Sequence, residues 1–138
     1  MYPIQIVAPM KEELTEYGFE ELFANLPQDI TSLVFNNKSN TNLNLDIPES
    51  ISRLKSLDAI MLMNCVKSLP ESIGQLTNLE FFSVPQNPGL KKIPESMANI
   101  PNLNFINIQG STNVKLGPKL SQLFEDSEQT GFYQKRDL

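Results

Sequence analysis

The sequence predicts an α/β solenoid, with short strands forming a parallel sheet on a concave side and short helices or 3₁₀ turns on the convex side. Three observations predict it. One five-residue phrase recurs at nearly constant spacing, and apolar residues recur at fixed offsets after each copy. Each copy also has too few apolar residues to enclose a core alone, so the copies are expected to stack and bury a shared one.

The segment before the repeats, residues 1–25, is predicted to be an N-terminal cap. Alternating apolar residues predict a short strand beside the first repeat: Tyr2, Ile4 and Ile6. A helix is predicted within residues 10–26, with an acidic first turn at Lys11-Glu12-Glu13 and a break at Gly18. Its apolar side chains follow the i, i+3, i+4, i+7 spacing of one helix face: Phe19, Leu22, Phe23 and Leu26.

The recurring phrase predicts the convex side. It reads Ile47-Pro-Glu-Ser-Ile51, Leu69-Pro-Glu-Ser-Ile73 and Ile93-Pro-Glu-Ser-Met97, so its copies start 22 and 24 residues apart. A degenerate copy, Leu116-Gly-Pro-Lys-Leu120, follows 23 residues later. Proline is tolerated in the first turn of a helix, and a glutamate there suits the helix dipole. Each phrase is therefore expected to begin a helix or 3₁₀ turn.

The residues after each phrase predict the strands. Apolar residues lie 10, 13 and 15 positions after each start, and the last two of these alternate as one face of a strand does. The three full copies are Leu57, Ile60 and Leu62; Leu79, Phe82 and Val84; and Leu103, Ile106 and Ile108. An earlier, degenerate copy contains Ile30, Leu33 and Phe35.

These residues give the pattern L-x-x-L-x-L-x-x-N, whose last position holds Cys65, Asn87 and Ser111. The pattern resembles the leucine-rich-repeat family, and Leu69–Leu79 resembles its intracellular, Ras-suppressor-like or plant-like class. The resemblance covers about residues 26–124, or about four repeats plus a terminal half repeat in one domain. It implies a right-handed solenoid that acts as a recognition scaffold. Lys38 departs from the pattern, which makes the first copy irregular.

The chain departs from the repeat at two further places. The interval from Phe35 to Ile47 is longer than in later copies and predicts a loop insertion. It contains Asn37-Lys38-Ser39, which fits a glycosylation acceptor but is better explained as accidental. A terminal amphipathic helix is predicted from Leu116, Leu120, Leu123 and Phe124, with no strand after it at the expected offset, because Asp126 occupies the expected apolar position. The tail, residues 125–138, is expected either to fold back as a cap or to remain mobile.

Composition excludes several functions. A net charge of −5 argues against nucleic-acid partners, and no apolar run is long enough for a membrane helix. One cysteine and no histidine exclude an intrachain disulfide, thiolate-rich zinc sites and imidazole-based catalysis. We therefore expect a cytoplasmic protein that is not an enzyme and has no metal or cofactor. Glu49, Glu71 and Glu95 form a convex column, better explained as exposed helix starts than as a cation site.

The concave face carries the candidate site. Phe81 and Phe105 are expected on neighbouring strands, in an apolar patch with a polar rim that is typical of a surface for a protein partner. The predicted partner-binding residues are Asp58, Ala59, Met61, Met63, Glu80, Phe81, Ser83, Asn104, Phe105 and Asn107.

Other interpretations of this patch stay open. The N-terminal strand or the Phe132-Tyr133 tail could cover it, and a homodimer could bury it. The chain could be a recognition fragment of a larger effector enzyme such as a ligase, or a self-associating structural protein. A monomer or weak homodimer is expected.

Overall fold

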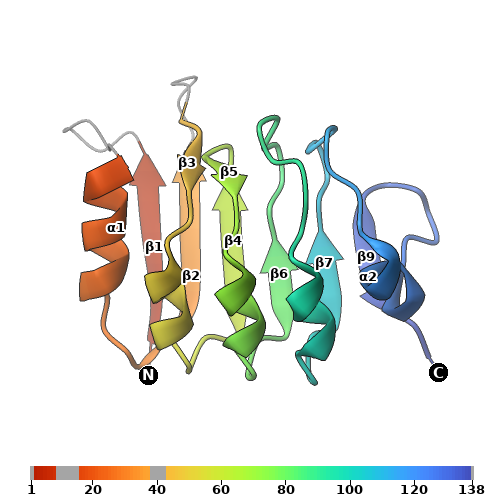
Figure 1. Cartoon of the computed structure of the whole chain (residues 1–138), viewed down its shortest axis with the longest axis horizontal. Coiled ribbons are helices and arrows are strands. Elements are labelled where there is room, and N and C mark those ends of the chain that lie inside the picture. Colours follow the sequence, from red (N-terminus) through yellow and green to blue (C-terminus); the bar gives the residue numbers. More distant parts are fainter. Residues whose placement is uncertain (1, 9–15, 38–42, 138) are drawn as a thin grey trace.

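The protein is a mixed α/β structure built on a mostly parallel, open sheet of seven strands (Figure 1). The computed structural model describes residues 2–8, 16–37 and 43–137, with side chains from residue 20 onward. The strand order is β1-β2-β4-β6-β7-β9-β8, in which the first five strands are parallel and β9 is antiparallel to both its neighbours. The strands are β1 (Tyr2–Ala8), β2 (Ile30–Asn37), β4 (Ala59–Met63), β6 (Phe81–Ser83), β7 (Phe105–Asn107), β8 (Phe124–Glu125) and β9 (Phe132–Lys135).

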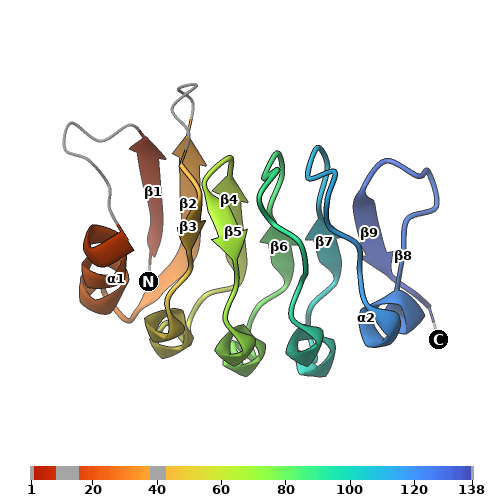
Figure 2. The same cartoon turned by 45° about the horizontal axis from the view of Figure 1, so that its top comes forward.

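The helices lie together on one face of this sheet (Figure 2). Three 3₁₀ helices follow the prolines of the three full phrases: η1 (Glu49–Arg53), η2 (Glu71–Gln75) and η3 (Glu95–Asn99). The predicted helical starts are thus confirmed. The terminal helix is α2 (Pro118–Leu123). The cap helix is α1 (Glu16–Asn25), and the predicted break at Gly18 is wrong because α1 runs through it. The predicted acidic first turn of the cap lies outside the described residues.

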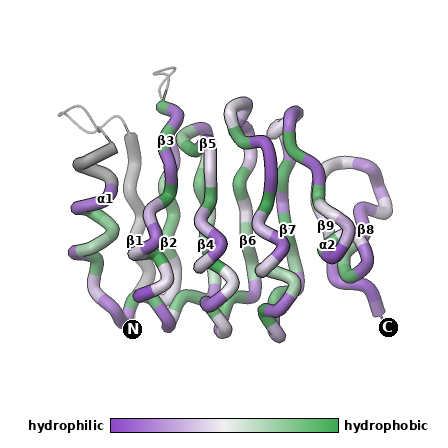
Figure 3. Tube along the Cα trace, viewed as in Figure 1, coloured by the Kyte–Doolittle hydropathy of each residue, from purple (hydrophilic) through white to green (hydrophobic). Residues whose placement is uncertain are grey.

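The core lies between the sheet and the 3₁₀ helices. The strand residues predicted to be apolar and internal are all buried, and Leu79, Phe82 and Val84 of the central unit have no exposed surface. Burial alternates along β4, with Ile60 and Leu62 buried and their neighbours half-buried. In Figure 3 hydrophobic segments recur from one unit to the next along the sheet. The repeat register assigned from the sequence is therefore confirmed for the core.

The cap is joined to the first unit by backbone pairing and by an arginine. The predicted N-terminal strand is confirmed as β1, which pairs in parallel with β2. Arg53, at the end of η1, donates from Nη2 to the carbonyl oxygens of Phe23 (2.9 Å) and Leu26 (2.7 Å). These carbonyls lie at the C-terminal end of α1, where backbone acceptors lack partners within the helix and positive charge is favoured.

The turn after each strand is held by the last position of the repeat pattern. Oδ1 of Asn87 accepts from the N–H groups of Cys65 (2.7 Å) and Val66 (3.0 Å), and its Nδ2 donates to the carbonyls of Leu62 (2.8 Å) and Pro85 (3.0 Å). Ser111 takes the equivalent place in the next unit. Its hydroxyl accepts from the Asn87 N–H (2.8 Å) and donates to the carbonyl of Val84 (2.6 Å).

The residue before the last position of the repeat pattern, which is Cys65, Asn87 or Ser111, has left-handed backbone geometry. Its φ is +55° at Asn64, +57° at Gln86 and +78° at Gly110. The same turn therefore recurs in three successive units. In the irregular first copy Asn37 is buried and donates to the Asn64 carbonyl (3.0 Å), whereas Lys38 lies outside the described residues.

Two features were not predicted. A second, two-stranded sheet pairs β3 (Leu45–Asp46) with β5 (Val66–Ser68). The sequence predicts no strand at the repeat offset and does not indicate the two strands that the structure has after the terminal helix: the chain enters β8 directly after α2 and returns as β9. A strand that returns antiparallel does not follow the residue spacing of the parallel strands. Asp126, where the repeat pattern ends, lies in the turn between β8 and β9. The strands β8 and β9 therefore form the end of the sheet.

Candidate functional site

We call the face of the seven-stranded sheet that lies away from the helices the open face. It corresponds to the predicted concave side. Strand register aligns Ala59 with Phe81 and Phe81 with Phe105 across the three central strands. Two positions further along the strands, Met61 pairs with Ser83 and Ser83 with Asn107. The columns of residues proposed from the sequence are thus neighbours in the sheet.

Three phenylalanines form a cluster on the open face. Ring centroids are separated by 6.1 Å between Phe81 and Phe105, 6.3 Å between Phe81 and Phe132, and 5.6 Å between Phe105 and Phe132, with tilted planes. These distances suit favourable aromatic pairs. All three side chains are half-buried. We call them the phenylalanine cluster.

The sequence indicates Phe132 only as part of a tail that could cover the patch. In the structure β9 lies beside β7, with Phe132 opposite Asn107, so this side chain enlarges the cluster from within the sheet. The available signal in the sequence was the adjacent pair of aromatic residues Phe132 and Tyr133, of which Tyr133 packs against the core in the structure. A segment this short does not show which strand it pairs with.

The methionine flank of the cluster is half-buried: Ala59, Met61 and Met63. Ser83 differs from the prediction, because its side chain has no exposed surface and cannot contact a partner. A serine is short, and Ser83 sits between Met61 and Asn107, whose Nδ2 donates to the serine hydroxyl (3.1 Å). Ser83 therefore supports Asn107 and is removed from the candidate site.

One rim of the open face is acidic and polar. Asp58, Glu80 and Asn104 immediately precede β4, β6 and β7, and all three are exposed. Their backbones are linked, because the N–H of Glu80 donates to the Asp58 carbonyl (2.8 Å) and that of Asn104 to the Glu80 carbonyl (2.9 Å). A shallow cavity of about 320 Å³ lies along this rim, lined by Thr31, Ser56, Asp58, Asn78, Glu80 and Asn102.

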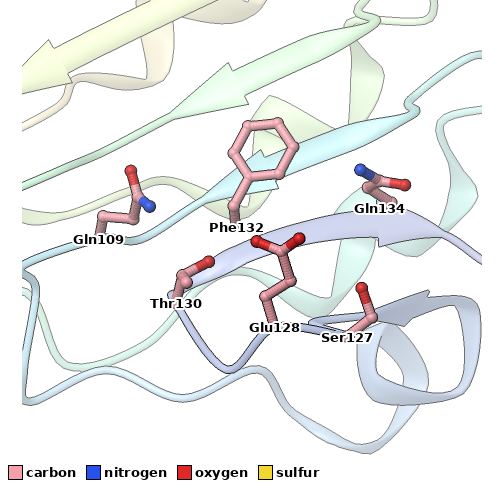
Figure 4. A pocket seen from close by; sticks show the side chains of 6 residues that line it. All are labelled: Gln109, Ser127, Glu128, Thr130, Phe132 and Gln134. Carbon is pink, nitrogen blue, oxygen red and sulfur yellow. The ribbon is translucent and has the colours of Figure 1, made fainter.

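A second cavity, of about 260 Å³, lies beside the phenylalanine cluster at the β8–β9 turn. Figure 4 shows the Glu128 carboxylate extending from the turn toward the Phe132 ring, with two glutamine amides on either side. The lining residues are Gln109, Ser127, Glu128, Thr130, Phe132 and Gln134. This cavity is not indicated by the sequence, because it depends on how the tail pairs with β7.

Asp126 builds the turn that forms this second cavity. Its carboxylate accepts from the N–H groups of Thr130 (3.0 Å) and Gly131 (2.6 Å). Gly131 has a φ of +92°, and a Cβ atom there would lie 3.1 Å from the Gln109 backbone, so glycine suits this close approach. Desolvation acts to raise the pKa of Asp126, but the backbone N–H bonds outweigh it and lower the pKa below its usual value.

Replacing Asp126 with alanine is expected to release β9 from β7. Two amides report on this docking: Ile108 N–H donates to the Gly131 carbonyl and Lys135 N–H to the Asn104 carbonyl, both at 2.8 Å. We expect hydrogen exchange at both to accelerate about tenfold or more in Asp126→Ala. The amide of Val84, which donates to Asn107, serves as the unaffected reference. Unchanged exchange at Ile108 and Lys135 would contradict this role.

The same docking is expected to weaken in acid. The folded-state pKa of Asp126 is lowered, so its stabilising contribution is complete above the ordinary value of 3.8 and is lost as the pH falls through the folded pKa. Exchange at Ile108 and Lys135, corrected for its intrinsic pH dependence, should therefore rise below about pH 4, and this rise should be absent in Asp126→Asn.

The single cysteine belongs to the core. Cys65 is buried, and desolvation raises the pKa of its thiol to about 12. The reactive thiolate is therefore scarce at neutral pH. We expect iodoacetamide to leave Cys65 unmodified at pH 8 in the folded protein and to alkylate it promptly in concentrated urea, as followed by mass spectrometry. Rapid alkylation of the folded protein would show that the thiol is accessible.

The convex glutamates do not converge. Glu49 and Glu71 are exposed, whereas Glu95 accepts from the N–H groups of Lys119 (2.8 Å) and Leu120 (3.4 Å) at the start of α2. Within the described ranges, no three histidine, cysteine, aspartate or glutamate side chains are arranged to hold a metal ion. None of the helices in these ranges has the length and apolarity needed to cross a bilayer.

No protein-family model matches this chain, and no curated protein sequence matches it. The residues of the open face therefore provide the evidence on function.

Proposed function

We propose that this protein is a leucine-rich-repeat solenoid whose open, concave face binds another protein. The repeated strand–3₁₀ unit supports the solenoid, as does the bonding of Asn87 and Ser111 at the asparagine position of the motif. Such stacking produces an extended binding surface along one side of the array. The function proposed is recognition, with no chemical step.

The phenylalanine cluster is the observation that carries this proposal. Three large aromatic side chains remain partly exposed on adjacent strands, with Met61 and Met63 beside them. Complete burial of one such side chain is worth roughly 1.5–3 kcal/mol, and binding energy concentrates at aromatic anchors in the centre of an interface. Methionine side chains adapt to irregular partner surfaces. A polar rim surrounds this apolar centre, as in ordinary protein interfaces.

The test is capture of protein partners from native lysate on the immobilised chain. A Phe81→Glu/Phe105→Glu variant should lose at least tenfold of any protein that the wild type retains, because it places two charges in the apolar centre. Its matched control is Gln75→Glu/Asn99→Glu, which adds the same charge at exposed positions of η2 and η3. Circular dichroism should show that both variants keep the wild-type fold.

Two results would contradict the proposal. One is that both variants retain the same proteins as the wild type; the other is that no protein is retained at all. Light scattering on the same samples tests self-association. A defined wild-type oligomer that dissociates only in the Phe81→Glu/Phe105→Glu variant would assign the open face to a second copy of the chain.

A further inference from the structure

We infer that the partner presents a cationic side chain, arginine or lysine, to the cavity beside Phe132, next to apolar residues that pack on the phenylalanine cluster. This inference rests on the proposed function and specifies the chemistry of the partner. It is carried by the lining of that cavity and by the charges around the cluster.

The cavity has the groups that a cation requires. The Glu128 carboxylate supplies negative charge, and Glu128 forms no salt bridge with the other described residues. The Phe132 ring forms a wall, so a cation that reaches the carboxylate also meets an aromatic face. The side-chain amides of Gln109 and Gln134 line the same cavity on either side of the Phe132 ring (Figure 4), and each amide has an oxygen that can accept from an N–H group once it is turned toward the ligand. A guanidinium, which is planar, positively charged and has five donors, suits a cavity that combines a carboxylate with an aromatic ring.

Charge on the rest of the open face favours the same partner. Asp58 and Glu80 are exposed at the opposite rim, where the parallel strands begin, so carboxylates flank the cluster on two sides. Among the described residues, those of the cluster and of the two cavities include no lysine or arginine. The nearby cations of the tail are engaged elsewhere: Lys135 Nζ donates to the Pro101 carbonyl (3.0 Å), and Arg136 pairs with Glu125 (3.2 Å).

This distribution disfavours two other occupants. An acidic or phosphorylated segment would bring like charges to Glu128, Asp58 and Glu80, a repulsion that costs affinity and slows association. A second copy of this chain would bring the same acidic rims to the interface. A basic segment is attracted by all three carboxylates and by the net charge of −5.

The test uses a defined probe, acetyl-Phe-Arg-amide, titrated into ¹⁵N-labelled full-length protein. We expect saturable shifts of the amide signals of Gln109, Glu128, Thr130, Phe132 and Gln134. The isosteric probe acetyl-Phe-citrulline-amide, which lacks the charge, should bind at least tenfold more weakly. Glu128→Gln should weaken the arginine probe by a similar factor. Glu71→Gln, which removes the same charge from an exposed position of η2, should leave its affinity unchanged.

The inference is overturned if the arginine probe shifts none of these amides, if the citrulline probe binds equally well, or if Glu128→Gln retains wild-type affinity. This failure is distinguishable from failure of the proposed function. If capture from lysate depends on Phe81 and Phe105 but the arginine probe does not bind, the proposed interaction surface stands and only the proposal of a basic partner is contradicted. If capture does not depend on Phe81 and Phe105, the proposal that the open face is the interaction surface is contradicted.

Discussion

Replacing Phe82 with alanine is expected to lower the free energy of unfolding by about 3–5 kcal/mol. Phe82 has no exposed surface and is among the largest fully buried side chains of the described residues. It lies in the central strand of the repeats and pairs with Ile60 on one side and Ile106 on the other. Its truncation leaves a cavity between two units, so the loss combines apolar burial and packing across both neighbouring strands.

Urea unfolding followed by circular dichroism measures this loss. Phe82→Leu retains much of the apolar volume and should cost less than half as much. Because stacked units depend on their neighbours, we also expect the alanine variant to unfold over a broader transition, as coupling across the central unit weakens. A change below about 1 kcal/mol in Phe82→Ala would mean that the two halves of the core do not depend on this contact.

Replacing Asn87 with alanine is expected to cost about 3 kcal/mol or more, although the side chain is polar and small. The substitution removes four hydrogen bonds within a buried turn, to Cys65, Val66, Leu62 and Pro85. Each buried backbone group left without a partner costs about 1–3 kcal/mol, partly recovered where water enters the turn. Asn87→Asp keeps the acceptors but directs a carboxylate at two carbonyl oxygens, so it should not restore stability.

The matched control is the same substitution at an exposed asparagine. Asn113 donates one hydrogen bond, to the Pro88 carbonyl (2.8 Å), and is exposed to solvent. Its replacement with alanine should change stability by less than about 1 kcal/mol. If the two alanine variants lose the same free energy of unfolding in urea, the buried hydrogen bonds of Asn87 contribute no more to stability than the single exposed bond of Asn113.

Most of the repeated part of the fold was predictable, because each element there is fixed by residues close in sequence. The proline of each phrase marks the start of a 3₁₀ helix, and alternation at Ile60 and Leu62 gives the buried face of a strand. The recurrence of both features sets the register between units. The side-chain direction of Phe81 and Phe105 follows from that register alone.

The cavity and the third phenylalanine were not predictable in this way. Their position depends on Asp126, which binds two backbone N–H groups and turns the chain back toward β7. That pairing joins residues distant in sequence and repeats nothing that precedes it. The burial of Ser83 was not predicted for a different reason. The repeat register shows to which face of the sheet a side chain points, but it does not show whether neighbouring side chains cover it. Ser83 is short and lies between Met61 and Asn107, which cover it.

The direction of the bonds between units has a consequence for biosynthesis. At Asn87, Ser96 and Ser111, a side chain of the later unit satisfies backbone groups of the earlier one. During synthesis, the turn at Cys65 and Val66 therefore lacks its acceptor until Asn87 has emerged from the ribosome. Folding of the nascent chain is expected to trail translation by about one repeat, so a pause within a unit would leave the preceding turn open for as long as it lasts.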